Sequence, residues 1–124
     1  IDELSCHEHA KPMMGDALGS ACIGMTPRPV HVLFVDPPYD MMRQPTSRRR
    51  VIEQIKRFRE VLADPSFVVL RSPVDPSNET PLIIDGFDGP EVHRYAKDMF
   101  VLLYQPQTAA AASDEPADVK TAEQ

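Results

Sequence analysis

The sequence predicts an α/β fold with a doubly wound, mostly parallel sheet whose last strand inserts antiparallel. Three observations predict it. Residues 30–35 (VHVLFV) form a nearly continuous apolar run, and residues 45–64 carry an apolar stripe at helical spacing. Residues 91–105 have the pattern of two strands around a tight turn.

The first part of the chain is expected to form a strand, a weak helix and a second strand. Residues 11–14 (KPMM) predict a short strand, and a Gly-Asp turn then leads into a helix that starts within GDALGSA. The prolines of residues 24–29 predict a loop. Because the run at 30–35 is apolar on both faces, we expect a central strand covered by helices on both sides, with His31 in the core.

The clearest helix is expected over residues 45–64. Thr46 or Ser47 can cap its start, and Pro65 follows its end. Its apolar stripe consists of Val51, Ile55, Phe58 and Leu62. Residues 66–72 (SFVVLRS) predict a second buried strand.

The rest of the chain is expected to form a loop, a short added strand at 82–85 (LIID) and an antiparallel hairpin that turns near Ala96–Asp98. Tyr95 and Tyr104 of this hairpin are expected to be packing residues. Residues 106–124 have no aromatic residue and no sustained apolar pattern, so they predict a disordered polar tail after a domain over residues 1–105.

The composition limits the class of protein. A chain of 124 residues with 42% hydrophobic and 26% charged residues predicts one small globular domain. The sequence has no apolar run long enough to span a membrane, and its two cysteines form no CxxC pattern. No basic and apolar stretch opens it, so we expect no secretory signal. We therefore expect a cytoplasmic protein with reduced thiols and no membrane contact.

The charge is distributed unevenly. Residues 41–59 hold seven basic side chains and one acidic one, whereas the whole chain has a net charge of −6. Such a concentrated cationic patch on an acidic protein predicts contact with a polyanion. The alternative is a solvated helix face.

A metal site is not expected. Cys6, His7 and His9 lie close together with Glu8, but structural zinc needs four ligands and the second half of such a motif is missing. A polar surface loop explains these residues better.

An unusual elbow follows the run at 30–35. Its residues are Asp36, Pro37, Pro38 and Tyr39, and the two prolines stop the strand because each lacks an N–H and fixes its own φ. The result is a rigid turn with a carboxylate on one side and an aromatic ring on the other.

This elbow resembles the (Asp/Asn)-Pro-Pro-(Tyr/Phe) motif of S-adenosylmethionine-dependent amino-methyltransferases, which methylate exocyclic amines of nucleobases. The resemblance implies that the Asp36 carboxylate and the Pro37 carbonyl accept the two N–H groups of the target amine. It also implies that Tyr39 stacks on the extruded base and that Pro37 and Pro38 hold the acceptors in place.

The chain resembles more narrowly the RsmD-like ribosomal RNA guanine-N2 methyltransferases, over residues 1–105. GDAL resembles the segment that meets the adenine of the cofactor, which implies that Asp16 accepts from the adenine amine and that Ala17 supplies a backbone contact. FVVLRS and the hairpin VHRYAKDMFVLLYQP resemble later elements of that family. The resemblance implies a Rossmann-like class I methyltransferase fold, S-adenosylmethionine as cofactor, small-subunit (16S) ribosomal RNA as partner, and a monomer.

One feature of that family is missing. Its members begin with a strand and a glycine-rich loop that holds the methionine half of the cofactor, and the five glycines of this chain form no such loop. The sequence therefore resembles the carboxyl-terminal part of the enzyme, incomplete at its N-terminus. We expect the isolated chain to be inactive and to bind S-adenosylmethionine poorly.

The basic patch begins just after the elbow. We expect Arg43, Arg48, Arg49 and Arg50 to flank the crevice and to contact RNA phosphates. Two alternatives stay open, a DNA adenine-N6 methyltransferase and a non-catalytic nucleic-acid-binding remnant that uses only this patch.

Overall fold

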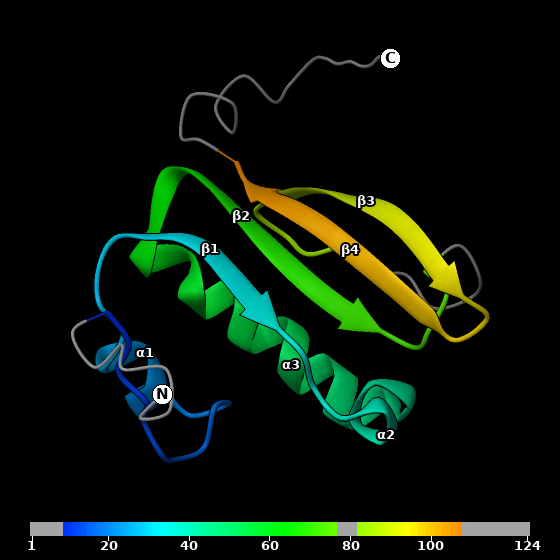
Figure 1. Cartoon of the computed structure of the whole chain (residues 1–124), viewed down its shortest axis with the longest axis horizontal. Helices are drawn as coiled ribbons and strands as arrows, with labels where there is room; N and C mark the ends of the chain where they lie inside the picture. The colour runs from blue at the N-terminus through cyan, green and yellow to red at the C-terminus, as the bar shows by residue number, and fades with distance from the viewer. Residues whose placement is uncertain (1–8, 77–81, 108–124) are drawn as a thin grey trace.

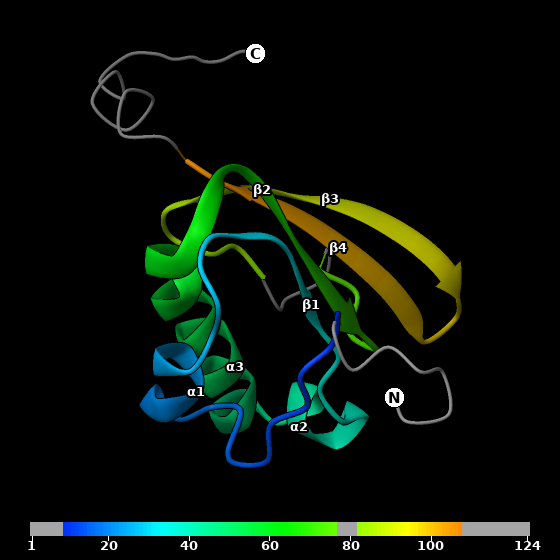
Figure 2. The same cartoon turned by 60° about the vertical axis from the view of Figure 1, so that its left-hand side comes forward.

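The computed structural model describes residues 9–76 and 82–107. Within these ranges the three α-helices lie on one face of a four-stranded sheet (Figure 1, Figure 2). In chain order the elements are α1 (Ser20–Gly24), β1 (Val30–Val35), α2 (Tyr39–Arg43), α3 (Pro45–Phe58), the 3₁₀ segment η2 (Arg59–Val61), β2 (Leu62–Ser72), β3 (Phe87–Ala96) and β4 (Met99–Pro106).

The sheet has the strand order β1-β2-β4-β3. β1 and β2 pair in parallel, whereas β4 pairs antiparallel with both β2 and β3. The prediction that the last strand inserts antiparallel is therefore confirmed, and so is the hairpin turn, because β3 ends at Ala96 and β4 begins at Met99. The parallel part of the described sheet is confined to β1 and β2.

The core lies between the sheet and α3. The predicted stripe residues Val51, Ile55 and Phe58 are all buried on α3, while Leu62, the fourth, is buried at the start of β2. Val51 and Ile55 share the main core cluster with alternate residues of the strands, chiefly Val68 and Leu70 of β2 and Leu102 and Tyr104 of β4. Phe58 belongs to a second, smaller cluster with Ile23 of α1 and Val61.

The ends of α3 differ from the prediction. Gln44 is the N-cap residue and Pro45 the first helical residue, which suits proline because its missing N–H is not needed there. The capping role expected for Thr46 or Ser47 is therefore wrong: the Ser47 hydroxyl donates instead to the Met41 carbonyl at 2.6 Å. The helix also ends earlier than expected, and Pro65 lies inside β2.

Two predicted strands do not form. Residues 11–14 are not part of the sheet, since no described strand pairs with them. Residues 82–85 form no strand either, but Leu82 and Ile84 are buried in the core, and the Leu82 carbonyl accepts the Tyr104 hydroxyl at 2.6 Å.

The face of the sheet opposite the helices is uncovered within the described residues (Figure 2). The expectation that the run at 30–35 is buried on both faces is wrong, because Phe34 is 75% exposed and Val32 is also exposed. His31 is exposed rather than a core residue, and Tyr95 is exposed rather than packed, whereas Tyr104 is buried as expected.

The predicted boundary at residue 105 lies close to the end of β4. Pro106 still belongs to that strand, and the Gln107 N–H donates to the Gly86 carbonyl at 2.9 Å, so both residues take part in the fold. The rest of the predicted tail, 108–124, lies outside the described residues, as do Cys6, His7 and Glu8.

Candidate functional site

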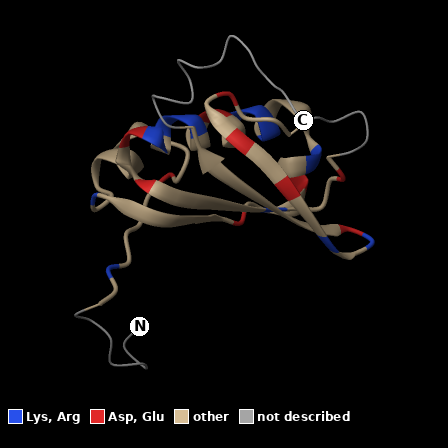
Figure 3. Ribbon diagram, turned by 90° about the horizontal axis from the view of Figure 1, so that it is seen from above, with Lys and Arg blue, Asp and Glu red and all other residues tan. Residues whose placement is uncertain are grey.

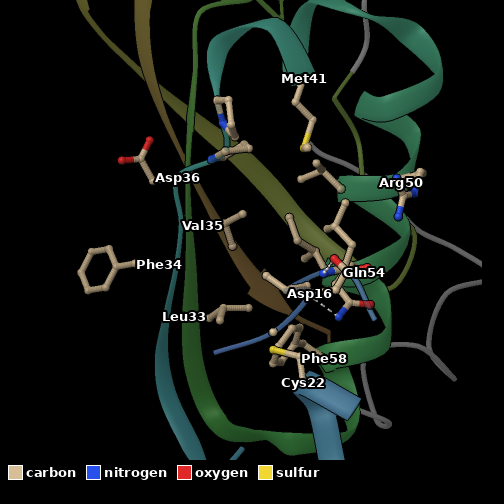
Figure 4. A pocket seen from close by; sticks show the side chains of 17 residues that line it. Asp16, Cys22, Leu33, Phe34, Val35, Asp36, Met41, Arg50, Gln54 and Phe58 are labelled. Atoms are coloured by element: carbon tan, nitrogen blue, oxygen red, sulfur yellow. Dashed lines mark hydrogen bonds between the residues drawn. The ribbon is translucent and has the colours of Figure 1, made fainter. Parts of the chain in front are cut away.

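A cavity of about 570 Å³ opens where β1 ends. Its walls come from the end of β1, the elbow, one side of α3 and the turn at residues 15–18 (Figure 4). Most of the wall is apolar, with Leu33, Val35, Met41, Val51, Ile55 and Phe58 among the lining residues. In open α/β sheets ligands bind at this edge, beyond the carboxyl ends of parallel strands.

The turn at one end of the cavity is held by its own hydrogen bonds. Asp16 Oδ1 accepts from the Leu18 N–H at 2.9 Å, and the Asp16 carbonyl accepts from the Gly19 N–H at 3.0 Å. Such an Asx turn is common for aspartate in loops. Asp16 and Ala17, the two predicted cofactor residues, both line the cavity.

The turn is also tied to α3 by Gln54. The Gln54 Nε2 donates to the Ala17 carbonyl at 2.8 Å and to the Gly19 carbonyl at 3.0 Å. Sequence reasoning missed Gln54. Its signal was its position, because it lies three residues after Val51 and one before Ile55, within the buried stripe of the helix.

The elbow distributes its side chains over both sides of β1. Leu33 and Val35 point toward the cavity, whereas Phe34 and Asp36 point to the opposite side (Figure 4), as the alternation of a strand requires. The backbone of Asp36, Pro37 and Pro38 nevertheless lines the cavity.

Asp36 has a partner on the neighbouring strand. The parallel register pairs Val35 with Leu70, which makes the next residues, Asp36 and Arg71, neighbours on the outer face. Arg71 Nη1 lies 3.5 Å from Asp36 Oδ2, and the Asp36 side chain is 62% exposed. The predicted catalytic carboxylate is thus ion-paired and accessible to solvent. Arg71 is a second residue that the sequence did not single out.

Tyr39 lies outside the cavity. It is the first residue of α2, and the Arg43 guanidinium lies over its ring, 5.7 Å from the centroid. The predicted stacking residue and one of the predicted phosphate-binding residues therefore contact each other.

The other three predicted phosphate-binding arginines differ in their surroundings. Arg48 Nη1 donates to the Met42 carbonyl at 2.9 Å, which ties the start of α3 to α2. Arg49 and Arg50 are exposed, and Arg50 lines the cavity. Basic residues continue along α3 (Figure 3), but Lys56 pairs with Glu53 and Arg59 donates to the Gln107 carbonyl.

Two further observations concern metal ligands and the length of the helices. Over residues 9–76 and 82–107, no group of His, Cys, Asp and Glu side chains could hold a metal ion. In the same ranges no helix is both long enough and apolar enough to cross a membrane.

Comparison with known proteins rests on structure. No protein-family model and no curated protein sequence matches the chain. The methyltransferase candidate YhhF of Escherichia coli is similar in structure, with 21% identity and a TM-score of 0.51, over 77% of this chain and 47% of YhhF. A conserved hypothetical protein of Streptococcus pyogenes matches with 18% identity and a TM-score of 0.50, over 70% of this chain and 49% of its own.

These likenesses show the fold. The chain spans about half the length of either neighbour. The order of its elements agrees with the predicted class, since a parallel pair at β1 and β2 is followed by a hairpin whose second strand inserts antiparallel. The fold is a Rossmann-like α/β fold, incomplete within the described residues and similar to that of the methyltransferase candidate YhhF.

Proposed function

We propose that the protein methylates the exocyclic N2 amine of a guanine in small-subunit ribosomal RNA, with S-adenosylmethionine as cofactor. The observation that carries the proposal is the DPPY elbow, which directly follows a parallel strand and borders a cavity at the carboxyl end of that strand. Since this chain spans about half of its structural neighbours, the activity is proposed for the whole protein.

The cavity fits the adenine end of the cofactor. Its volume of about 570 Å³ is within the usual range for small-molecule sites, and its apolar walls suit a flat ring. The Asp16 carboxylate and the buried Gln54 Oε1 offer acceptors, and Oε1 has no hydrogen-bond partner among the described residues. Bound there, S-adenosylmethionine supplies an electrophilic methyl group.

The proposed chemistry of the elbow is that of two acceptors for one amine. The lone pair of an aromatic amine is delocalised into its ring, so the nitrogen is a poor nucleophile until its N–H groups are held. In this proposal the exposed Asp36 side chain, which pairs with Arg71 and points away from the cavity (Figure 4), turns toward the amine and accepts one N–H. The Pro37 carbonyl accepts the other, and Pro37 and Pro38 hold the backbone of the elbow in place. Because the Asp36 side chain is exposed, it can pass the released proton to solvent.

In this proposal the target guanine leaves the stacked bases of the RNA and stacks on the Tyr39 ring. A base within a helix is out of reach of an enzyme, so the target has to be extruded or single-stranded. Arg43 already lies over the Tyr39 ring and adds a cation beside the proposed RNA path.

The test is methyl transfer by the full-length protein to small-subunit ribosomal RNA. Asp36→Ala is expected to lower turnover by at least ~100-fold, the scale of losing a group that stabilises charge in the transition state. Asp40→Ala is the matched control, because Asp40 is an exposed acid in the first turn of α2.

Three outcomes would contradict the proposal. Wild-type turnover in Asp36→Ala removes the role of the elbow. Methylation of adenine-containing duplex DNA instead of RNA favours the alternative substrate. RNA binding without any S-adenosylmethionine-dependent transfer favours the non-catalytic alternative.

A further inference from the structure

The β3–β4 hairpin ends in an exposed turn that carries an aromatic ring. Tyr95, the last but one residue of β3, is 67% exposed, and Lys97 and Asp98 form the turn before β4 begins at Met99. One exposed aromatic residue on a protein surface needs no explanation by itself. What Tyr95 can do depends on where the turn lies and on which charges lie beside it.

The turn lies at the same edge of the sheet as the elbow. β4 pairs antiparallel with both β2 and β3, so β3 runs in the same direction as β2, and β1 is parallel to β2. The arrowheads of β1, β2 and β3 accordingly point the same way in Figure 1. The turn after β3 and the elbow after β1 therefore lie at one edge, where the cavity also opens.

A row of paired residues joins the elbow to the hairpin. Asp36 neighbours Arg71 across the parallel register, Arg71 pairs with Val101, and Val101 pairs with His93. The row crosses all the strands of the described sheet, and its length is about 14 Å at the usual spacing of about 4.8 Å between strands. A few nucleotides of single-stranded RNA can span this distance.

Two basic side chains along this path have capacity to bind phosphate. Arg71 is 42% exposed, its Nη1 lies 3.5 Å from Asp36 Oδ2, and its Nε has no partner among the described residues. Since a guanidinium has five N–H donors, Arg71 keeps donors for a phosphate oxygen. Lys97, at the tip, is exposed and makes no ion pair within residues 9–76 and 82–107.

The other charged groups of the hairpin are already in contact with a neighbour or are acidic. His93 Nε2 lies 2.8 Å from Glu91 Oε2. The Arg94 guanidinium lies over the Phe100 ring, 5.6 Å from its centroid, and Arg94 Nε donates to the last carbonyl of β3 at 3.3 Å, so Arg94 holds the shape of the tip. Asp98 is exposed in the turn and lowers the local positive charge. The aromatic ring is therefore the main feature that the tip offers to a ligand.

We infer that the tip of the β3–β4 hairpin binds a nucleotide that flanks the target base: the Tyr95 ring stacks on its base, and Lys97 contacts a phosphate. The inference rests on the proposed function, which brings an RNA guanine to the elbow. Arg71 lies between the two contacts and binds the intervening backbone. A single strand alternates base and phosphate, which matches a ring beside cations. Stacking is possible with every base, so the tip positions the strand without reading its sequence.

The experiment measures binding of two fluorescent oligoribonucleotides to the full-length protein by anisotropy. One is a single strand of uridines around a central guanine. The other has the same length and the same phosphates, but abasic nucleotides flank the guanine. Wild type is expected to bind the strand with bases more tightly, because only this strand offers a ring for Tyr95 to stack on.

The decisive variant is Tyr95→Ala. It is expected to weaken binding of the strand with bases by roughly 5- to 100-fold, the range for one stacked base, and to leave the abasic strand nearly unchanged. Tyr95→Phe keeps the ring and should keep the wild-type affinity. Phe67→Ala is the matched control, because Phe67 is an exposed aromatic residue in the middle of β2, away from this edge.

Two further measurements separate positioning from a structural role. In methyl transfer to small-subunit ribosomal RNA, Tyr95→Ala should raise KM and leave kcat at saturating RNA unchanged, because the ring does not contact the target amine. Lys97→Ala should lower the slope of log affinity against log salt by ~0.7, the value for one phosphate of a single strand. Arg57→Ala should keep the slope, since α3 runs from the elbow to the start of β2 and places Arg57 near the opposite edge.

The remaining outcomes overturn the inference or the proposed function separately. If Tyr95→Ala weakens both strands equally, or weakens neither and keeps the wild-type KM, the tip stacks on no base and only the proposed function stands. The inference also fails if wild type binds the two strands equally or binds neither. If Tyr95→Ala binds RNA like wild type but no longer sediments with small ribosomal subunits, the tip binds protein instead. If binding depends on Tyr95 but the full-length protein transfers no methyl group, the proposed function fails and the RNA contact at the tip holds.

Discussion

Asp36 and Tyr104 are two residues whose surroundings determine what they can do. Asp36 lies at the exposed end of β1 and pairs with Arg71 across the parallel register. An exposed ion pair of this kind contributes little to stability. Its effect is local, because it places the positive charge of Arg71 beside the carboxylate of the elbow. Tyr104 has the opposite environment: it is 1% exposed, and its hydroxyl donates to the Leu82 carbonyl.

Tyr104→Phe tests the contribution of that buried hydrogen bond. The variant keeps the ring but leaves the Leu82 carbonyl without its donor, which is expected to lower the free energy of unfolding by about 1–3 kcal/mol near neutral pH. Urea unfolding at pH 8 measures it. Tyr95→Phe is the control, because Tyr95 is exposed and should change this free energy by less than about 0.5 kcal/mol.

The difference in stability between wild type and Tyr104→Phe is expected to depend on pH. Burial raises the pKa of Tyr104, so the folded state keeps its proton where the unfolded state begins to lose it, above about pH 10. The stabilisation that Tyr104 gives is therefore complete below pH ~10 and decreases as the pH rises further, by up to about 1.4 kcal/mol per pH unit. The advantage of wild type over Tyr104→Phe should shrink between pH 9 and 11. If urea unfolding gives the same difference in free energy between the two proteins at pH 9 and pH 11, this prediction is wrong.

At the scale of elements, α3 performs two tasks with two of its faces. Its buried face packs on the sheet through Val51 and Ile55 and holds the 15–19 turn through Gln54. Its exposed face carries arginines, whose number suggested a single phosphate-binding patch. Arg48 differs from the other arginines, because its guanidinium donates to the Met42 carbonyl and therefore has a structural role.

The exposed arginines are expected to account for the salt dependence of RNA binding. Removing one arginine that binds a phosphate lowers the slope of log affinity against log salt by ~0.7–0.9, because fewer counterions are then released. Arg49→Ala combined with Arg50→Ala should therefore reduce the slope by about 1.4–1.8, as measured by filter binding of a small-subunit ribosomal RNA fragment at several salt concentrations.

Two single variants complete this test. Arg57→Ala, an exposed position at the far end of α3, should leave the slope nearly unchanged. Arg48→Ala should mainly lower stability, because its guanidinium bonds to backbone. An unchanged slope in the Arg49 and Arg50 double variant means that this face of α3 is only solvated.

The elements themselves were predictable where their pattern is local. The hairpin and the stripe of α3 were identified because strand alternation and helical spacing are properties of neighbouring residues. The strand expected at 11–14 was not predictable in this way, since a strand needs a partner and none of the described strands pairs with it. The same distinction applies to the site. The elbow is a local motif and could be predicted, whereas Arg71 contacts Asp36 and Gln54 contacts Ala17 only because the fold brings distant segments together.

At the scale of the whole molecule, the described residues cover only one face of the sheet. Parallel strands are normally buried on both faces, and the apolar character of β1 follows that rule. Yet Phe34 and Val32 of β1 and Phe67 of β2 are exposed. Phe34 points away from the helix side (Figure 4), and the register pairs Val32 with Phe67. The apolar pattern of β1 shows that the strand is suited to burial on both faces. Whether its outer face is covered depends on residues outside the strand.

This asymmetry predicts unequal effects of identical substitutions. Phe34 is 75% exposed and Phe100 is 3% exposed, although both lie on strands of the same sheet. Phe34→Ala should change the free energy of unfolding by less than about 1 kcal/mol, because little apolar area returns to water on unfolding. Phe100→Ala should cost about 3–5 kcal/mol, since it removes a buried ring and leaves a cavity.

Urea unfolding of the two variants measures the difference, and a dye that binds apolar surface gives a second readout. Anilinonaphthalene sulfonate should bind the folded chain at the uncovered face, because contiguous exposed apolar side chains attract such ligands. Phe34→Ala combined with Phe67→Ala should reduce that fluorescence without loss of the folded circular dichroism spectrum. If Phe34→Ala instead destabilises the chain as strongly as Phe100→Ala, the outer face of β1 is covered in solution.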